Sequence, residues 1–285
     1  MSSYRLPEES HPSDRRFLIE VRRLAEVLEF GLDASRFRGP GIDFLQSRPY
    51  EFGDPVESID WRVTARTHRL HVKEHESLRG TPLYVVVDRS ASMCTSSVSR
   101  SKYSWAVRLA GAFAFAALGR LSPVGLYALG KRPVFSAPSL GSAKVRGWLR
   151  DLRAFPLDDD RSLRDSLRQL EVTIQPPGLL IVLSDLHDPE ARRLLKGLAH
   201  RYETIIIQLH DPAERGEVSG FFRGREAETG RGFLGRQGDR WIDPAQVADE
   251  LRGAPLDRAF VDISKPVASK IARFLKSRVQ RARRS

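Results

Sequence analysis

Cysteine is nearly absent from this sequence of 285 residues, which contains only Cys94. A single thiol cannot form an intramolecular disulfide, and it cannot supply the thiolate ligands of a structural zinc site. We interpret Cys94 as a small packing residue in a protein of a reducing compartment. Disulfide scaffolds and thiolate zinc sites are therefore excluded.

Long hydrophobic runs are also missing. The longest, Leu109–Leu118, lies between Arg108 and Arg120 and has about half the roughly 20 residues that a membrane-spanning helix needs. The first residues, "MSSYRLPEESHPSDRR", mix acidic and basic side chains, unlike a secretory signal peptide. From the sequence we expect a soluble, cytoplasmic protein with no membrane partner.

The motifs of several enzyme classes are absent too. The sequence has no Gly-x-Ser-x-Gly nucleophile elbow and no glycine-rich phosphate loop ending in Lys-Ser or Lys-Thr. A phosphatase with a nucleophilic aspartate would carry a second acid two residues later, but Ser90 occupies that place after Asp88. We therefore expect a binding protein and not an enzyme.

The net charge of +11 and the isoelectric point near 10.2 come mainly from arginine. These arginines are spread along the chain among acidic residues, and only the final "KSRVQRARRS" is a cluster. Two interpretations remain open. The favoured one is a solvated basic surface that meets an acidic partner. The alternative is nucleic-acid binding, led by Arg281, Arg283 and Arg284, which should weaken steeply with added salt.

Apolar runs of strand length alternate with helical patterns from residue 81 onward. This alternation predicts an α/β fold with a doubly wound, mainly parallel sheet over residues 81–285. Residues 216–242 are punctuated by glycine and are expected to form an excursion, as a hairpin. Residues 1–15 are expected to be a flexible N-terminus. Residues 16–80 begin with helical spacing and continue with turn signals and an edge strand, which indicates a small N-terminal module.

The most informative stretch is "YVVVDRSASM", in which a buried strand ends in Asp88-x-Ser90-x-Ser92. Carboxylate and hydroxyl oxygens are ligands of Mg²⁺ or Mn²⁺. A second apolar strand ends in "LSD", which places Asp185 at the same edge of a parallel sheet, where ligands bind in this architecture. His187 is interpreted as a loop histidine, since the expected site prefers oxygen.

This pattern resembles the von Willebrand factor A domain and its metal-ion-dependent adhesion site. The resemblance implies metal ligands at Asp88, Ser90, Ser92 and Asp185, with Mg²⁺ or Mn²⁺ as the ion. The family also uses a threonine in a Gly-Gly-Thr loop, where this sequence has "PLDDDRSLRDSL". Either the hydroxyl of Ser162 or the carboxylate of Asp160 would take that place, and weak ion binding is expected.

The preceding segment resembles the domain-of-unknown-function-58 family. The matching positions are Arg48, Tyr50, Gly53, Asp54, Ile59, Asp60, Trp61, Arg62, Ala65 and Arg66. Relatives of this kind are often encoded beside MoxR-type AAA+ ATPases. The resemblance implies an adaptor that uses its ion to bind a carboxylate of a partner protein. For the Ile59–Arg62 run, we expect Trp61 to bury its ring while an Arg–Asp pair closes the module, and the alternative is a partner surface.

Overall fold

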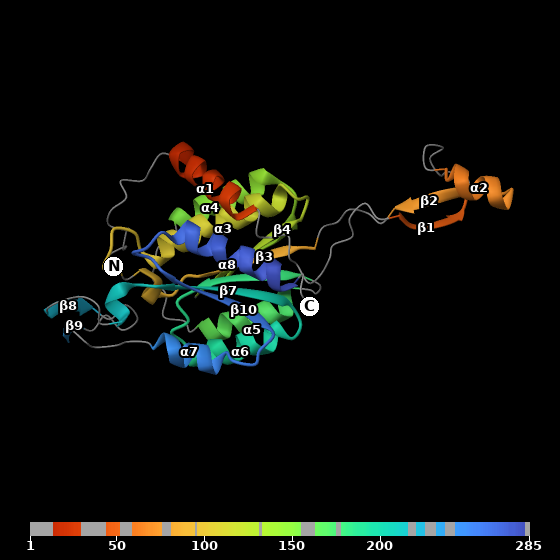
Figure 1. The fold of residues 1–285 in the computed structure, drawn as a ribbon. Helices are drawn as coiled ribbons and strands as arrows, with labels where there is room; N and C mark the ends of the chain where they lie inside the picture. The colour runs from red at the N-terminus through yellow and green to blue at the C-terminus, as the bar shows by residue number, and fades with distance from the viewer. Residues whose placement is uncertain are drawn as a thin grey trace. The chain divides into compact units, whose positions relative to one another are not determined.

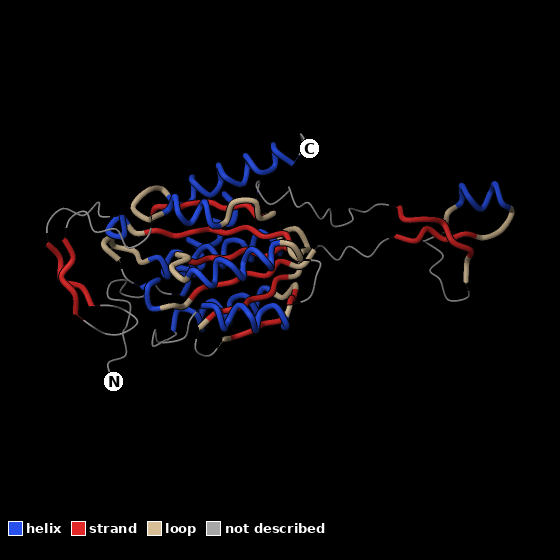
Figure 2. Tube along the Cα trace, turned by 90° about the horizontal axis from the view of Figure 1, so that it is seen from below, coloured by secondary structure: helices blue, strands red, loops and turns tan. Residues whose placement is uncertain are grey.

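Six strands form the central sheet, in the order β10-β7-β6-β3-β4-β5. Five of them run parallel, and β5 pairs antiparallel with β4 at one edge. The sheet lies between layers of helices (Figures 1 and 2). The strands are β3 (Leu83–Asp88), β4 (Val124–Leu129), β5 (Val134–Ser139), β6 (Leu179–Ser184), β7 (Glu203–His210) and β10 (Leu256–Asp262). The predicted fold class, an α/β fold with a doubly wound and mainly parallel sheet, is confirmed.

The sheet is the centre of the larger of two compact units. The computed structural model describes residues 14–29, 44–51, 59–75, 81–94, 96–130, 133–154, 163–174, 178–215, 221–225, 232–236 and 243–282. One unit is Met1–Phe37 together with Thr81–Ser285, and the other is Arg38–Gly80. Each unit is described by itself.

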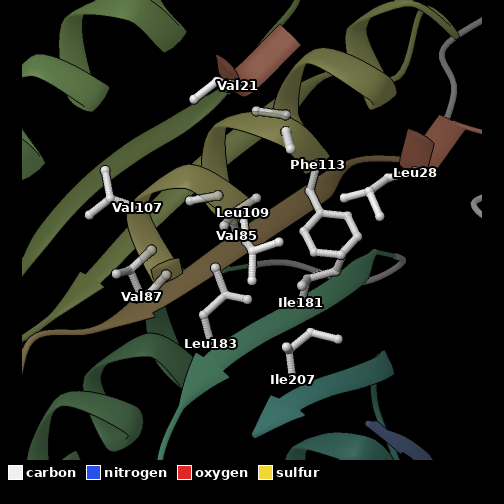
Figure 3. Close-up of a cluster of buried hydrophobic side chains, with 14 of the residues drawn as sticks. Val21, Leu28, Val85, Val87, Val107, Leu109, Phe113, Ile181, Leu183 and Ile207 are labelled. Carbon is white, nitrogen blue, oxygen red and sulfur yellow. The ribbon is translucent and has the colours of Figure 1, made fainter. Parts of the chain in front are cut away.

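Helices cover both faces of the sheet because alternate strand residues are apolar on both sides. Val85 and Val87 belong to a core under α1 (Asp14–Glu29), α3 (Lys102–Leu118), α4 (Ser142–Ala154) and α8 (Val267–Ala282) (Figure 3). Tyr84 and Val86 face a second core under α5 (Leu163–Thr173), α6 (Pro189–Ala199) and α7 (Pro244–Glu250). Burial on two faces explains the apolar runs of β3, β4 and β6 and the apolar centre of β7, which is Ile205–Ile207.

The edge strand β5 was not expected from the sequence. Its residues "VFSAPS" are partly exposed and include Pro138, so they lack the continuous apolar run of the central strands. Proline is tolerated at an edge because a strand there needs only one set of ladder hydrogen bonds. The excursion within residues 216–242 contains β8 (Phe221–Arg225) and β9 (Gly232–Arg236), which pair antiparallel as a two-stranded sheet.

The module expected over residues 16–80 is divided in the structure. Helix α1 belongs to the larger unit, where it packs on α3, and Phe17, Val21 and Leu28 are buried in the shared core. Gly111 of α3 permits this close approach, because a Cβ atom there would lie 2.6 Å from Val21 Cγ1. The helix therefore completes the larger core, and Arg38–Gly80 forms a unit without it.

In the smaller unit, β1 (Phe44–Pro49) pairs antiparallel with β2 (His71–His75), and α2 (Trp61–Thr67) lies between them in sequence. Asp60 caps α2 by accepting hydrogen bonds from the backbone N–H groups of Arg62 and Val63, and it also accepts one from the Ser47 hydroxyl at 2.6 Å. The expectation that Trp61 buries its ring is wrong for this unit. The side chain is 65% exposed, whereas Asp60 is buried.

The contact between α1 and α3 generates a prediction about stability. Gly111→Ala should destabilise the protein by about 1–3 kcal/mol, because the new methyl overlaps two buried side chains, Val21 and Leu149, in a packed core. The matched control is Gly147→Ala in α4, where a Cβ atom meets nothing within 4 Å. That variant should gain up to about 1 kcal/mol from helix propensity. Urea denaturation of both measures the difference, and equal effects would contradict the close packing of α1 on α3.

Candidate functional site

Two carboxylates lie at the carboxyl ends of the neighbouring strands β3 and β6. Asp88 is the last residue of β3, and Asp185 directly follows β6. The two strands pair in parallel, with Val87 opposite Leu183. Both carboxylates are buried, and the Ser184 hydroxyl joins the two strand ends by donating a hydrogen bond to Asp88 Oδ2 at 2.6 Å. The chain continues from β3 to β4 on one side and later returns to β6 on the other side. The carboxyl-terminal edge of the sheet where β3 meets β6, called this edge below, is therefore the topological switch point.

The serine turn follows Asp88 directly. The Ser90 backbone N–H donates to Asp88 Oδ1 at 2.8 Å, and the Ser90 and Ser92 hydroxyl oxygens lie 3.0 Å apart. The alternating residues Ala91 and Met93 are buried in the short 3-10 turn η2 (Ala91–Cys94). The alternation therefore has a physical reason, because the apolar residues anchor the turn while the serines converge at its other side.

The donor set fits a small hard cation by its chemistry, because hydroxyl and carboxylate oxygens are the ligands that Mg²⁺ prefers. The Ser90 and Ser92 hydroxyls are hydrogen-bonded to each other at 3.0 Å, so both lie at one place on the turn. Asp88 lies beside them, and the Ser92 hydroxyl also stabilises the Asp185 carboxylate. The structure thus brings together four of the five predicted ligands. Ser162, like the alternative Asp160, lies outside the described residues.

A buried lysine shares this site, and the sequence reasoning missed it. Lys102 is fully buried in the first turn of α3, after the N-cap Ser101. Its Nζ donates to Asp185 Oδ2 at 2.7 Å and to Glu214 Oε1. Burial alone would lower the pKa of Lys102, but the two carboxylates outweigh it and raise that pKa. The lysine is therefore charged, and it lies against one of the predicted metal ligands.

His187 also lies among these carboxylates. Its Nε2 is 3.3 Å from Glu214 Oε1 and 3.8 Å from Asp185 Oδ2. Burial would lower the pKa of His187, but Asp185 and Glu214 raise it. Asp185, His187 and Glu214 offer ligand atoms within 4.8 Å of one another. Sequence reasoning missed Glu214, which follows β7 in the turn η3 (Pro212–Arg215) beside Asp185.

The backbone after Asp185 is held in an uncommon conformation. Leu186 is buried and has a φ of 59°, in the left-handed region that favours glycine. Its N–H donates to the Ser184 hydroxyl at 2.9 Å, so the serine that binds Asp88 also fixes this turn. Strain of this kind is found where the surrounding structure fixes a functional side chain.

The two carboxylates have opposite protonation tendencies. Burial and the charge of Asp185 raise the pKa of Asp88 to about 6, against the hydrogen bonds from Ser184 and Ser90. Burial would also raise the pKa of Asp185, but the ammonium of Lys102 holds that pKa well below its usual range. Asp185 is thus ionised throughout the neutral range, whereas Asp88 gains a proton under mildly acidic conditions.

Of the three arginines named for the nucleic-acid alternative, one lies within the described residues. Arg281 lies in α8 and pairs with Asp257, and Arg283 and Arg284 lie outside the described residues.

Within the described part of the chain, no helix combines the length and apolar character that crossing a bilayer requires.

Comparisons with known proteins give a family and related chains. The family model "Protein of unknown function DUF58" matches residues 46–234. The uncharacterized proteins Rv1480 of Mycobacterium tuberculosis (strain ATCC 25618 / H37Rv) and Mb1516 of Mycobacterium bovis (strain ATCC BAA-935 / AF2122/97) are each 29% identical over 252 residues, covering 85% of this chain and 76% of theirs. The crystal structure of the SpRpn10 VWA domain is similar at a TM-score of 0.41 and 11% identity, covering 67% of this chain and 93% of that chain.

The raised pKa of Asp88 predicts a pH-dependent effect of Asp88→Asn. A folded pKa of about 6, above the ordinary value of 3.8, means that ionisation of Asp88 weakens the fold as pH rises through this range. The amide does not ionise, so the variant should gain stability relative to the wild type between about pH 4 and pH 7.5, by roughly 1–3 kcal/mol. Thermal denaturation across this range measures the gain. A stability difference between Asp88→Asn and the wild type that does not change with pH would contradict the burial of Asp88 beside Asp185.

Proposed function

The chain belongs to the DUF58 family, and from the geometry of its sheet edge we propose that it is a non-enzymatic adaptor that binds a partner protein through a divalent-cation site. The observation that carries this proposal is the convergence of four oxygen-bearing side chains where β3 meets β6. They are Asp88, Ser90, Ser92 and Asp185. The proposed ion is Mg²⁺ or Mn²⁺, because all four side chains offer hard oxygen ligands.

The residues of this edge would have different roles in such a site. Ser90 and Ser92 would offer neutral hydroxyl oxygens, while Asp88 and Asp185 would supply negative charge. A bound ion would supply an open coordination position for a carboxylate oxygen of the partner. The Ser184 hydroxyl and the Ser90 N–H hold Asp88 in place before any ion arrives, which lowers the cost of ordering the site.

Support for binding in place of catalysis comes from the groups around the turn. Ser90 stands where a second acid would act in an aspartate-based phosphatase. The thiol of Cys94 is also a poor nucleophile, because burial raises its pKa well above the ordinary value. The partner we propose is an AAA+ ATPase of MoxR type, which the family resemblance implies, and we place the adaptor in the cytoplasm. The net charge of +11 would speed encounter with an acidic partner.

Ion binding is the first test of the proposal. Isothermal titration calorimetry with Mg²⁺ and Mn²⁺ should give saturable heats for the wild type and none for Asp88→Ala, which loses a ligand and the centre of the hydrogen-bonded turn. Asp151→Ala, which removes an exposed carboxylate from α4, should match the wild type. Identical heats from the wild type and Asp88→Ala would exclude an ion at this edge.

Partner retention is the second test. A tagged wild-type protein should retain the ATPase from an extract of the native host, and EDTA or Asp88→Ala should each reduce the retained amount several-fold, because both remove the proposed contact. Asp151→Ala should retain it normally. Retention that ignores both EDTA and the Asp88 change would place the contact elsewhere. The exposed Trp61 on α2 would then be the next candidate, and Trp61→Ala would test it.

A further inference from the structure

Lys102 lies at this edge, and the proposed site does not use it. Lysine is almost never fully buried unless it is paired, yet Lys102 has no exposed side-chain surface. It also stands in the first turn of α3, where the helix dipole disfavours a positive charge. Both costs require compensation from its partners, Asp185 and Glu214.

The ammonium lies where a metal ligand would have to act. Lys102 Nζ is 2.7 Å from Asp185 Oδ2, and the Ser92 hydroxyl stabilises the same carboxylate. An ion held by Ser92 and Asp185 would therefore share its carboxylate with a fixed positive charge. Like charges at such short range repel strongly in a buried site.

The second partner of Lys102 is fixed independently of any ion. Glu214 is buried, and its Oε2 accepts a hydrogen bond from the Asp211 N–H at 3.0 Å. Lys102 can thus remain paired with Glu214 when Asp185 turns toward an ion. The remaining titratable groups that face this ammonium are His187, whose pKa Lys102 lowers, and the Cys94 thiol.

We propose that Lys102 is a built-in counter-cation that competes with the divalent ion for Asp185 and thereby sets the ion affinity of the site. In the absence of an ion it neutralises part of the charge of two buried carboxylates, Asp185 and Glu214. The edge therefore stays formed without metal, at the cost of weaker ion binding. This inference rests on the proposed ion site and adds the residue that tunes it.

The experiment replaces Lys102 by methionine, which keeps its length and removes its charge. Calorimetric titration of Lys102→Met with Mg²⁺ and Mn²⁺ should show affinity raised on the order of tenfold or more over the wild type. The control Lys265→Met removes a lysine that lies 3.6 Å from Asp262 at the end of β10 and is largely exposed. Its affinity should equal that of the wild type.

A second variant controls for unfolding, because Lys102→Met removes the ammonium that pairs with both Asp185 and Glu214. Lys102→Met/Glu214→Gln removes one charge of each sign, and its affinity is compared with that of Glu214→Gln alone. The increase should appear in this background too. In the folded variants that lack Lys102, adding Mg²⁺ should also raise the melting temperature more than it does in the wild type.

The outcomes separate this inference from the proposed function. Ion binding by the wild type with equal or weaker binding by both lysine variants would overturn the role of Lys102 and leave the ion site standing. No binding by the wild type or by any lysine variant would overturn the ion site and this inference together. Binding that appears only after Lys102 is removed would support the competition for Asp185 but would overturn ion binding by the wild type, and with it the proposed function.

Discussion

The parallel pairing of β3 with β6 is the constraint on which the rest of this edge depends. Ser184 and Asp88 are 96 residues apart in the chain, yet the register of the two strands places them in direct hydrogen-bond contact. Because both strands are buried on both faces by helices, their side chains meet the outside only at the strand ends. Polar side chains can therefore gather where β3 and β6 end, and the fold brings two carboxylates there.

Two buried carboxylates close to each other repel when both are ionised, and the structure compensates this repulsion differently for Asp88 and for Asp185. Asp88 is stabilised by hydrogen bonds and has a raised pKa, so that its neutral form is accessible. Asp185 stays ionised because Lys102 supplies a positive charge at 2.7 Å. The protonation of Asp88 thus depends on pH in the mildly acidic range, while Asp185 is kept ionised by its ion pair with Lys102.

The sequence allowed the strands and their polar ends to be predicted because each depends on local pattern. Continuous apolar runs identified β3 and β6, and the parallel arrangement placed Asp88 and Asp185 at one edge. The partners of Lys102 were beyond such reasoning, since they lie 83 and 112 residues away and are set by packing. A signal was nevertheless present, because a lysine in the first turn of an apolar helix opposes the helix dipole.

Other elements were missed or misread for similar reasons. The edge strand β5 carries proline and polar residues, so its pattern does not resemble that of a buried strand. Helix α1 had a clear amphipathic pattern, but the pattern does not reveal which core receives its apolar face. Trp61 was expected to be buried because of its size, yet the small unit of two strands and one short helix leaves its ring exposed.

The buried charges of this edge are expected to contribute little to the stability of the folded protein. Replacing a buried ion pair with well-packed apolar residues is often neutral or stabilising, and the left-handed backbone at Leu186 adds strain. A sheet with four fully buried strands can carry these costs without losing its fold. Strain and charge gather at the topological switch point, where ligands bind in open α/β sheets. This placement supports the proposal that the edge serves recognition.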